Sequence, residues 1–139
     1  MLLNKSQIDA TFGPTLLRHY TPKLDDAFVR TTFRYQMRQA PEFNVELMDN
    51  TLPLLLDLMF VRVASLADDP DHIMGYAFGR DQTLGFVYVR KSLRGQGLGQ
   101  YLTSQVTQSP THYLLAPPNV QFVHKLGLDK ISITQWLAI

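Results

Sequence analysis

A glycine-rich run near residue 95 has the composition and spacing of an anion-binding loop. It places three glycines at alternate positions, just before a segment that is typical of a helix. Glycines allow a backbone to approach a ligand closely, and the first N–H groups of a helix have no partners within the helix. The helix dipole adds partial positive charge at the same end. The run therefore predicts a diphosphate site formed by Arg94, Gly95, Gln96, Gly97, Leu98 and Gly99.

Two other phosphate-binding loops do not fit this run. A P-loop requires Lys followed by Ser or Thr after its last glycine, whereas Gln100 and Tyr101 follow here. The dinucleotide fingerprint places two residues between its last two glycines, and only Leu98 lies between Gly97 and Gly99. It also requires an acidic residue about 20 positions later, and none occurs before Asp129.

Other kinds of catalytic centre lack the residues that they need. The sequence contains no cysteine, which excludes disulfides, thiolate metal sites and a cysteine nucleophile. The four histidines are scattered and no carboxylate cluster accompanies them, so we expect no metal site. Ser92 and Ser104 lack the strand–turn–helix context of a nucleophile elbow.

Size and composition indicate an ordinary globular protein. The 139 residues predict one domain over 1–139, with 45% hydrophobic and 18% charged residues. The net charge of +1 argues against broad binding of nucleic acid, although the second half of the chain is basic. No apolar run approaches the roughly 20 residues of a membrane span, and the first residues lack the order of a signal peptide. We therefore expect a cytoplasmic protein without a membrane partner. The sequence leaves the oligomeric state open, and a homodimer is one of the possibilities.

A strand must lead into the loop, and a helix must follow it. Residues 83–89 are almost wholly apolar and predict a strand that is covered on both faces, and residues 98–108 predict the helix. The remaining pattern predicts an α+β fold, in which a mixed, mostly antiparallel central sheet is flanked by helices in three layers. The other expected strands are 15–20, 60–66, 73–78, 111–115 and 130–137, and the other helices are 24–39, 46–56 and 120–126.

The loop resembles the signature of the Gcn5-related N-acetyltransferase (GNAT) superfamily, Gln/Arg-x-x-Gly-x-Gly/Ala. Arg94, Gly97 and Gly99 match it, and Val89 stands five residues before the arginine, as in the commoner extended form. Downstream, the run from Lys125 to Leu128 is similar to a later signature that ends in Lys-x-Gly-Phe. The resemblance covers roughly residues 71–128, and the chain resembles, more loosely, short acetyltransferase-like proteins encoded by phages. For a phage protein the location would be the host cytoplasm.

The resemblance implies a GNAT-like fold and acetyl-CoA as co-substrate. Loop N–H groups would bind the CoA diphosphate, and the end of the preceding strand, here Val87 and Val89, would bind the pantetheine arm. The implied reaction is transfer of an acetyl group to an amine by direct attack. The first helices, roughly residues 28–48, would line the acceptor cleft. The acceptor stays open, a nucleobase included, and a different acyl donor also stays open.

The catalytic residues are less well marked than the loop. Many family members place a proton-donating tyrosine two residues before the lysine of the later signature, where this sequence has Val123. His124 follows it, about 100° further round a helix. The candidates for acid–base catalysis are Tyr88, Tyr113 and His124, although these residue types in these contexts are more often packing or surface residues. A second function therefore remains open, namely a catalytically weak or inactive GNAT-fold binding or regulatory protein.

Overall fold

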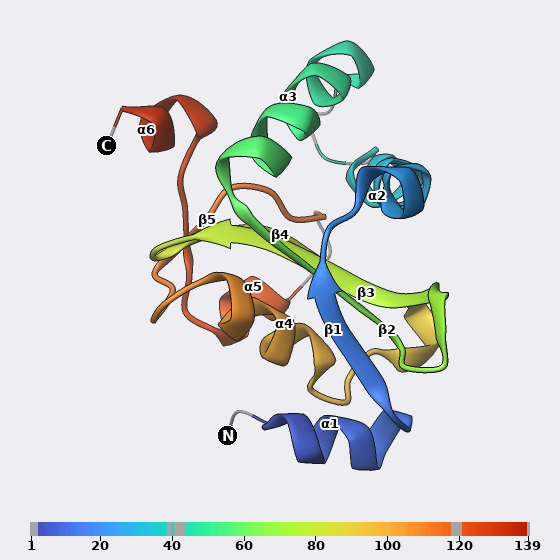
Figure 1. Ribbon diagram of the computed structural model, residues 1–139. Coiled ribbons are helices and arrows are strands. Elements are labelled where there is room, and N and C mark those ends of the chain that lie inside the picture. Colours follow the sequence, from blue (N-terminus) through green and yellow to red (C-terminus); the bar gives the residue numbers. More distant parts are fainter. Residues whose placement is uncertain (1–2, 39, 41–43, 118–120, 139) are drawn as a thin grey trace.

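A six-stranded sheet, in the order β1-β2-β3-β4-β5-β6, organises the chain (Figure 1). The computed structural model describes residues 3–38, 40, 44–117 and 121–138. Strands β1 to β4 pair in antiparallel fashion, and β5 and β6 join by parallel pairing. In chain order the elements are α1 (Lys5–Phe12), β1 (Thr15–His19), α2 (Pro22–Met37), α3 (Val45–Leu58), β2 (Phe60–Leu66), β3 (Asp69–Arg80), β4 (Thr83–Val89), η1 (Lys91–Leu93), α4 (Leu98–Val106), β5 (His112–Tyr113), α5 (Phe122–Lys125), β6 (Asp129–Lys130) and α6 (Ile133–Leu137).

Helices cover both faces of the sheet, as Figure 1 shows for α2 and α3 on one face and α1, α4 and α5 on the other. The core on the first face includes Val29 and Phe33 from α2 and Leu55 from α3. The core on the second face includes Ile8 from α1 and Leu102 from α4. The predicted fold class, a mixed and mostly antiparallel sheet flanked by helices, is confirmed.

A buried ion pair fixes the start of α2 against β1. Both terminal nitrogens of Arg18 donate to the carboxylate of Asp25 over 2.7 Å, and the Asp25 side chain is fully buried. The same carboxylate accepts the N–H of Thr21 at 2.8 Å, at the position that precedes the helix. This contact fixes the start of α2, whose Phe28 and Phe33 contact aromatic rings of β3 and β4.

The central strands follow the prediction more closely than the two ends of the chain. Strands β2 and β4 have the predicted bounds, but β3 is longer, because the turn before it is confined to Ala67 and Asp68. No helix was predicted at the N-terminus, where Asn4 and Gln7 form a reciprocal capping box that begins α1.

The predicted strand over 130–137 is wrong. Strand β6 ends at Lys130, and α6 follows it, because Ser132 and Gln135 form another reciprocal capping box. The predicted helix over 120–126 begins outside the described residues, and its described part is α5. Gly127 lies just beyond it with a positive φ of 70°.

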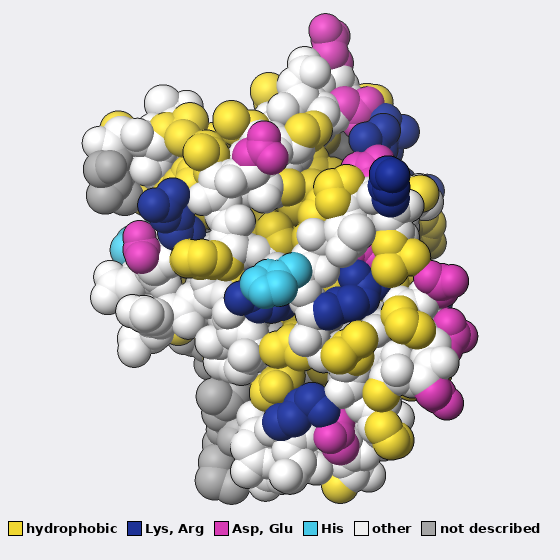
Figure 2. All heavy atoms as spheres, viewed as in Figure 1, with side chains coloured by type: hydrophobic (Ala, Val, Ile, Leu, Met, Phe, Trp, Pro, Cys, Tyr) yellow, Lys and Arg dark blue, Asp and Glu magenta, His cyan; other side chains and the backbone are white. Residues whose placement is uncertain are grey.

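Helix α3 continues through Pro53 to Leu58, two residues beyond the end of the predicted helix over 46–56. It buries Met48, Leu52 and Leu55 and leaves Leu47 and Leu54 exposed. On the face shown in Figure 2, hydrophobic side chains gather in the upper half of the molecule, where α3 lies, and basic side chains lie across the middle. Within the described ranges, no helix combines the length and the apolar character that a bilayer span requires.

Candidate functional site

On one edge of β4, pairing with the neighbouring strand β5 stops halfway along β4. Phe78 of β3 pairs with Phe86 but Gly79 pairs with Leu84, so Gly85 is an extra residue that forms a β-bulge in β4. Strand β5 pairs with β4 only at Thr83 and Leu84. The N–H of Leu115 then donates to the Gly85 carbonyl at 3.1 Å. Beyond this bond, no described strand pairs with this edge of β4.

The open edge presents the backbone of the two valines that the sequence singled out. The N–H of Arg90 donates to the Met74 carbonyl at 2.9 Å, so the backbone groups of Arg90 point toward β3. Successive residues of a strand direct their backbone groups to opposite neighbours. Val87 and Val89 therefore direct their N–H groups away from β3, to the edge that β5 leaves open.

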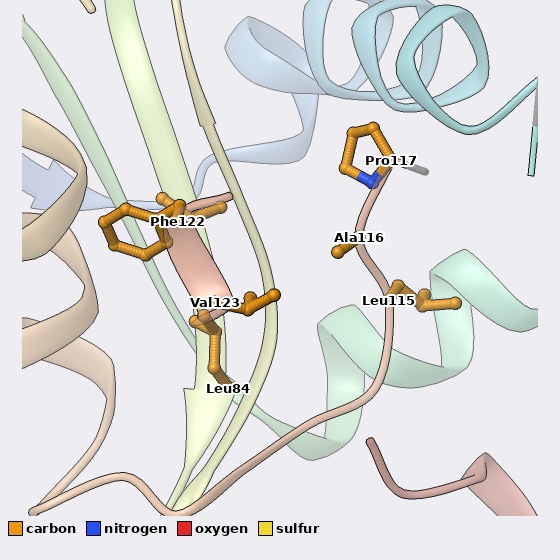
Figure 3. A pocket seen from close by; sticks show the side chains of 7 residues that line it. Leu84, Leu115, Ala116, Pro117, Phe122 and Val123 are labelled. Carbon is orange, nitrogen blue, oxygen red and sulfur yellow. The ribbon is translucent and has the colours of Figure 1, made fainter. Parts of the chain in front are cut away.

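A narrow apolar pocket lies beside this edge (Figure 3). The side chains of Leu84 and Val87 contribute one wall from β4, and Phe122 and Val123 contribute another from α5. The segment that follows β5 closes the pocket, and Figure 3 shows Leu115, Ala116 and Pro117 in succession along it.

The predicted anion loop follows the open edge directly. Gly95 and Gly97 have φ values of 78° and 92°, which are left-handed conformations that favour glycine. The first hydrogen bond at the start of α4 runs from the Tyr101 N–H to the Gly97 carbonyl at 3.0 Å. The six N–H groups from Gly95 to Gln100 donate to no group in the part of the chain that the structure describes. They form a set of donors at the positive end of a nine-residue helix.

Gly99 joins the loop to the pocket. A Cβ atom on this residue would lie 3.4 Å from the ring of Phe122 and 3.6 Å from Cγ2 of Val89. The start of α4 thus packs directly on the end of β4 and on the helix that lines the pocket. Leu98 is buried in the core, whereas Gln96 is exposed. Leu98 can therefore offer a ligand only its backbone.

Arg94 folds back onto the strand that precedes it. Its Nε donates to the Val89 carbonyl at 2.7 Å, and its guanidinium carbon lies 5.7 Å from the ring centroid of Tyr88. The side chain therefore closes the turn between β4 and the loop, although the residue as a whole is exposed.

The structure places the two tyrosine candidates on opposite faces of the sheet. Tyr88 is half-buried on the face of α2, with its ring stacked on Tyr76 at a centroid distance of 5.5 Å. Tyr113 is half-buried in the core on the face of α4 and α5, and the Nζ atom of Lys130 lies 5.4 Å from its ring centroid.

The third candidate, His124, is exposed on α5 and does not line the pocket. Its neighbour Val123 is buried and does line it. At the position where the resemblance implies a proton donor, the chain therefore has Val123, an apolar side chain that lines the pocket.

Sequence reasoning missed an aromatic group that surrounds Tyr88. Phe28 of α2 contacts Tyr88 edge to face at a centroid distance of 5.9 Å, and Tyr76 of β3 stacks on it. Burial raises the pKa of Tyr76 far above its usual range, and its hydroxyl donates to the Val29 carbonyl and shares a 2.8 Å hydrogen bond with Thr32. Tyr76 is thus a neutral, fixed group that holds α2 against the sheet. The one sequence feature that indicates this packing is the spacing of Phe28 and Thr32, which lie four residues apart on the same face of a helix.

Comparisons with known proteins find similarity in structure alone. No family model and no curated protein matches the sequence. A Rhodopseudomonas palustris protein described as a GCN5-related N-acetyltransferase is 19% identical with a TM-score of 0.49, over 66% of this chain and 62% of its own. A structure of the NatC complex bound to Gag peptide and CoA is 13% identical with a TM-score of 0.44, over 66% and 64%. A Deinococcus radiodurans R1 protein, provisionally described as an acetyltransferase, is 16% identical with a TM-score of 0.45, over 95% and 90%.

The chain thus spans less than two thirds of the first two of these chains. Within the described ranges, no three His, Asp or Glu side chains gather as a metal site would require.

Proposed function

We propose that this chain is an acetyl-CoA-dependent N-acetyltransferase, with residues 1–139 as one acyl-CoA N-acyltransferase-like domain. One observation carries the proposal: the open edge of β4 leads directly into six N–H groups without described partners at the start of α4. A CoA thioester has the complementary chemistry, since its pantetheine arm carries amide groups and ends at a diphosphate. A strand edge suits the amides, and a helix N-terminus suits the diphosphate.

We assign different parts of CoA to different groups of residues. The N–H groups from Gly95 to Gln100 hold the diphosphate, and the backbones of Val87 and Val89 bind the amides of the arm. The apolar pocket beside Val87 receives the arm itself. Its cavity volume is about 10 Å³, which is about the space of one water molecule. The segment after β5 and α5 therefore have to separate when the arm enters.

The reaction is a direct attack of an amine nitrogen on the thioester carbonyl carbon. The C–N bond forms, the C–S bond breaks, and CoA leaves as a thiolate. The attacking ammonium, with a pKa near 10 in water, first loses a proton to water or a base, and the departing thiolate gains one. Positioning of the two reactants, and an edge N–H of β4 that polarises the carbonyl, supply most of the catalysis.

The two faces of the sheet suggest separate roles for the tyrosines. Tyr113 belongs to the core that borders the pocket, so we assign it the proton that the thiolate needs. Tyr88 lies on the other face and is assigned to the incoming amine. His124 is the third candidate, and because it is exposed it reaches the thiolate only if α5 turns.

The test combines calorimetry with a reaction screen. Titration with CoA should show binding, and incubation with acetyl-CoA and mixed amines should give acetylated products by mass spectrometry. Absence of CoA binding at millimolar concentration overturns the proposal.

A second candidate function rests on Val123. Because this buried valine stands where the resemblance implies a proton donor, and β4 carries no carboxylate, the chain could bind CoA without turnover. Thermal stabilisation by CoA, with no transfer to any amine, would favour a binding or regulatory protein.

A further inference from the structure

A leucine from a distant part of the sequence packs against the middle of the anion loop. A Cβ atom on Gly97 would lie 2.5 Å from Cδ1 of Leu3 and 3.1 Å from its Cγ. Leu3 directly precedes the cap of α1, and it is half-buried against the core on the α4 face. Figure 1 shows α1 on the same side of the sheet as the loop that leads into α4. The loop therefore has a contact that belongs neither to β4 nor to the apolar pocket.

The start of α1 fixes where this leucine lies. Asn4 caps the helix, since its side chain accepts the N–H of Gln7 at 2.9 Å and its own N–H donates to the Gln7 side chain at 2.9 Å. Leu3 stands just before the cap and Ile8 at the fourth helical position, which are the two positions of a hydrophobic staple. Ile8 is fully buried in the same core. The capped helix start therefore holds Leu3 against the loop.

Leu3 lies behind Gly97 and does not cover its hydrogen-bond donor. Gly97 has a φ of 92°, and at this angle the tetrahedral Cα places the Cβ direction and the N–H bond on opposite sides of the N–Cα bond. The side chain of Leu3 fills the Cβ direction. The N–H of Gly97 therefore points away from the leucine and stays available to a ligand.

The two left-handed glycines of the loop differ in their surroundings. A Cβ on Gly95 would meet nothing within 4 Å, whereas the same direction at Gly97 is filled by Leu3. A glycine populates many backbone conformations when nothing restricts it. A free loop that is already held in its bound conformation loses less entropy on binding and therefore binds more tightly. Leu3 supplies this restriction at Gly97, the residue that caps α4.

We infer that Leu3 is a positioning residue for CoA, because it holds Gly97 in the conformation that presents the loop N–H groups to the diphosphate. This inference rests on the proposed function. It couples α1, which contributes no residue to the apolar pocket, to the binding of CoA. Since such coupling is reciprocal, bound CoA also stabilises the start of α1.

The experiment compares ligands with and without the diphosphate. Calorimetry measures the Kd of CoA, and amide spectra measure the Kd of pantetheine, which has the same arm but no diphosphate. The variants are Leu3→Ala and Leu3→Met, and Phe12→Ala is the control, because Phe12 is half-buried against the same core at the other end of α1. Urea unfolding gives the stability of each variant, and backbone order parameters report the motion of Gly97 without ligand.

We expect Leu3→Ala to raise the Kd of CoA roughly 3- to 10-fold and to leave the Kd of pantetheine unchanged. The order parameter of the Gly97 amide should fall in this variant. Leu3→Met keeps the volume of the side chain and should recover most of the CoA affinity. Phe12→Ala removes a larger side chain, so it should lose at least as much stability and keep the CoA affinity of the wild type.

The other outcomes overturn the inference. An unchanged Kd of CoA in Leu3→Ala does so, and so does an equal rise for CoA and pantetheine, which would mean general damage to the pocket. A lower Kd of CoA would show that Leu3 obstructs the loop. An equal loss of CoA affinity in Phe12→Ala would show that stability decides, rather than the contact with Gly97. If wild-type chain binds no CoA, the proposed function fails first, and this inference fails with it.

Discussion

Arg94 donates its Nε hydrogen to the carbonyl of Val89, five residues earlier, over 2.7 Å. This bond joins the last residue of β4 to the first residue of the loop that carries the glycines. It closes the turn that brings the open strand edge and the start of α4 into one site. In the loop signature the arginine and the valine occupy fixed positions, and the bond gives a physical reason for that spacing.

Removal of this bond should loosen the loop. Arg94→Met keeps an unbranched side chain over Tyr88 but loses the donor, and we expect the Kd for CoA to rise about tenfold, as a hydrogen bond from a charged donor is worth about 1.5 kcal/mol. Arg80→Met is the control, since Arg80 makes a comparable bond to the Leu58 carbonyl at the far end of β3. Equal loss of CoA affinity in both variants, measured by calorimetry, would contradict a specific role for Arg94.

Gly97 should tolerate no side chain. Its φ of 92° is strained for any L-residue, and a Cβ would lie 2.5 Å from Cδ1 of Leu3. Gly97→Ala should cost about 1–2 kcal/mol of unfolding free energy and should also weaken CoA binding. Gly13→Ala is the matched control, because Gly13 has a φ of 85° with nothing within 4 Å of its Cβ. The control should lose similar stability and keep its CoA affinity, and a loss of CoA affinity in both would refute the assignment.

Tyr113 and Tyr88 should affect turnover rather than cofactor binding. Tyr113→Phe removes the proposed acid for the thiolate, and we expect kcat to fall at least tenfold with an unchanged Kd for CoA. Tyr88→Phe should lower kcat or raise the KM of the amine. The control is Tyr35→Phe, at an exposed position of α2. Wild-type kcat in both variants would show that these hydroxyls take no part in the reaction.

The bulge in β4 depends on Gly85. A Cβ there would lie 2.6 Å from Cδ1 of Phe78 and 2.7 Å from the sulfur of Met59, both in the core. Gly85→Ala should therefore destabilise the fold by about 1–3 kcal/mol, measured by urea unfolding. Gly99→Ala adds the same methyl group at ordinary contact distances and should change the unfolding free energy by less than about 1 kcal/mol. Equal stabilities for the two variants would mean that the bulge accommodates a side chain.

Local patterns predicted the centre of the fold well. β2 and β4 followed from β-branched and aromatic runs, and the loop followed from its glycines. The end of the chain was misread as a strand over 130–137, because the capping pair Ser132 and Gln135, which starts a helix there, was not recognised. The similar pair Asn4 and Gln7 was available in the sequence and marked the helix α1.

The site was predictable only in part, because it depends on pairing between distant segments. Because side chains alternate along a strand, Tyr88 lies on the opposite face of the sheet from Val87 and Val89. Nothing local to β4 indicates that β5 leaves it after Gly85, since that follows from the register of a parallel pair. For the same reason the sequence did not show that Tyr113 and Tyr88 lie on opposite faces, or that Arg90 lies over Phe28.

The central claim is that CoA binds along the open edge of β4 and at the start of α4. Amide proton–nitrogen correlation spectra, recorded during a titration with CoA, test it residue by residue. The largest shifts should fall on the amides of Val87, Val89 and Gly95 to Gln100, with small changes along β1 and β2. Shifts that leave these amides unmoved, or that gather on another part of the chain, would contradict the account.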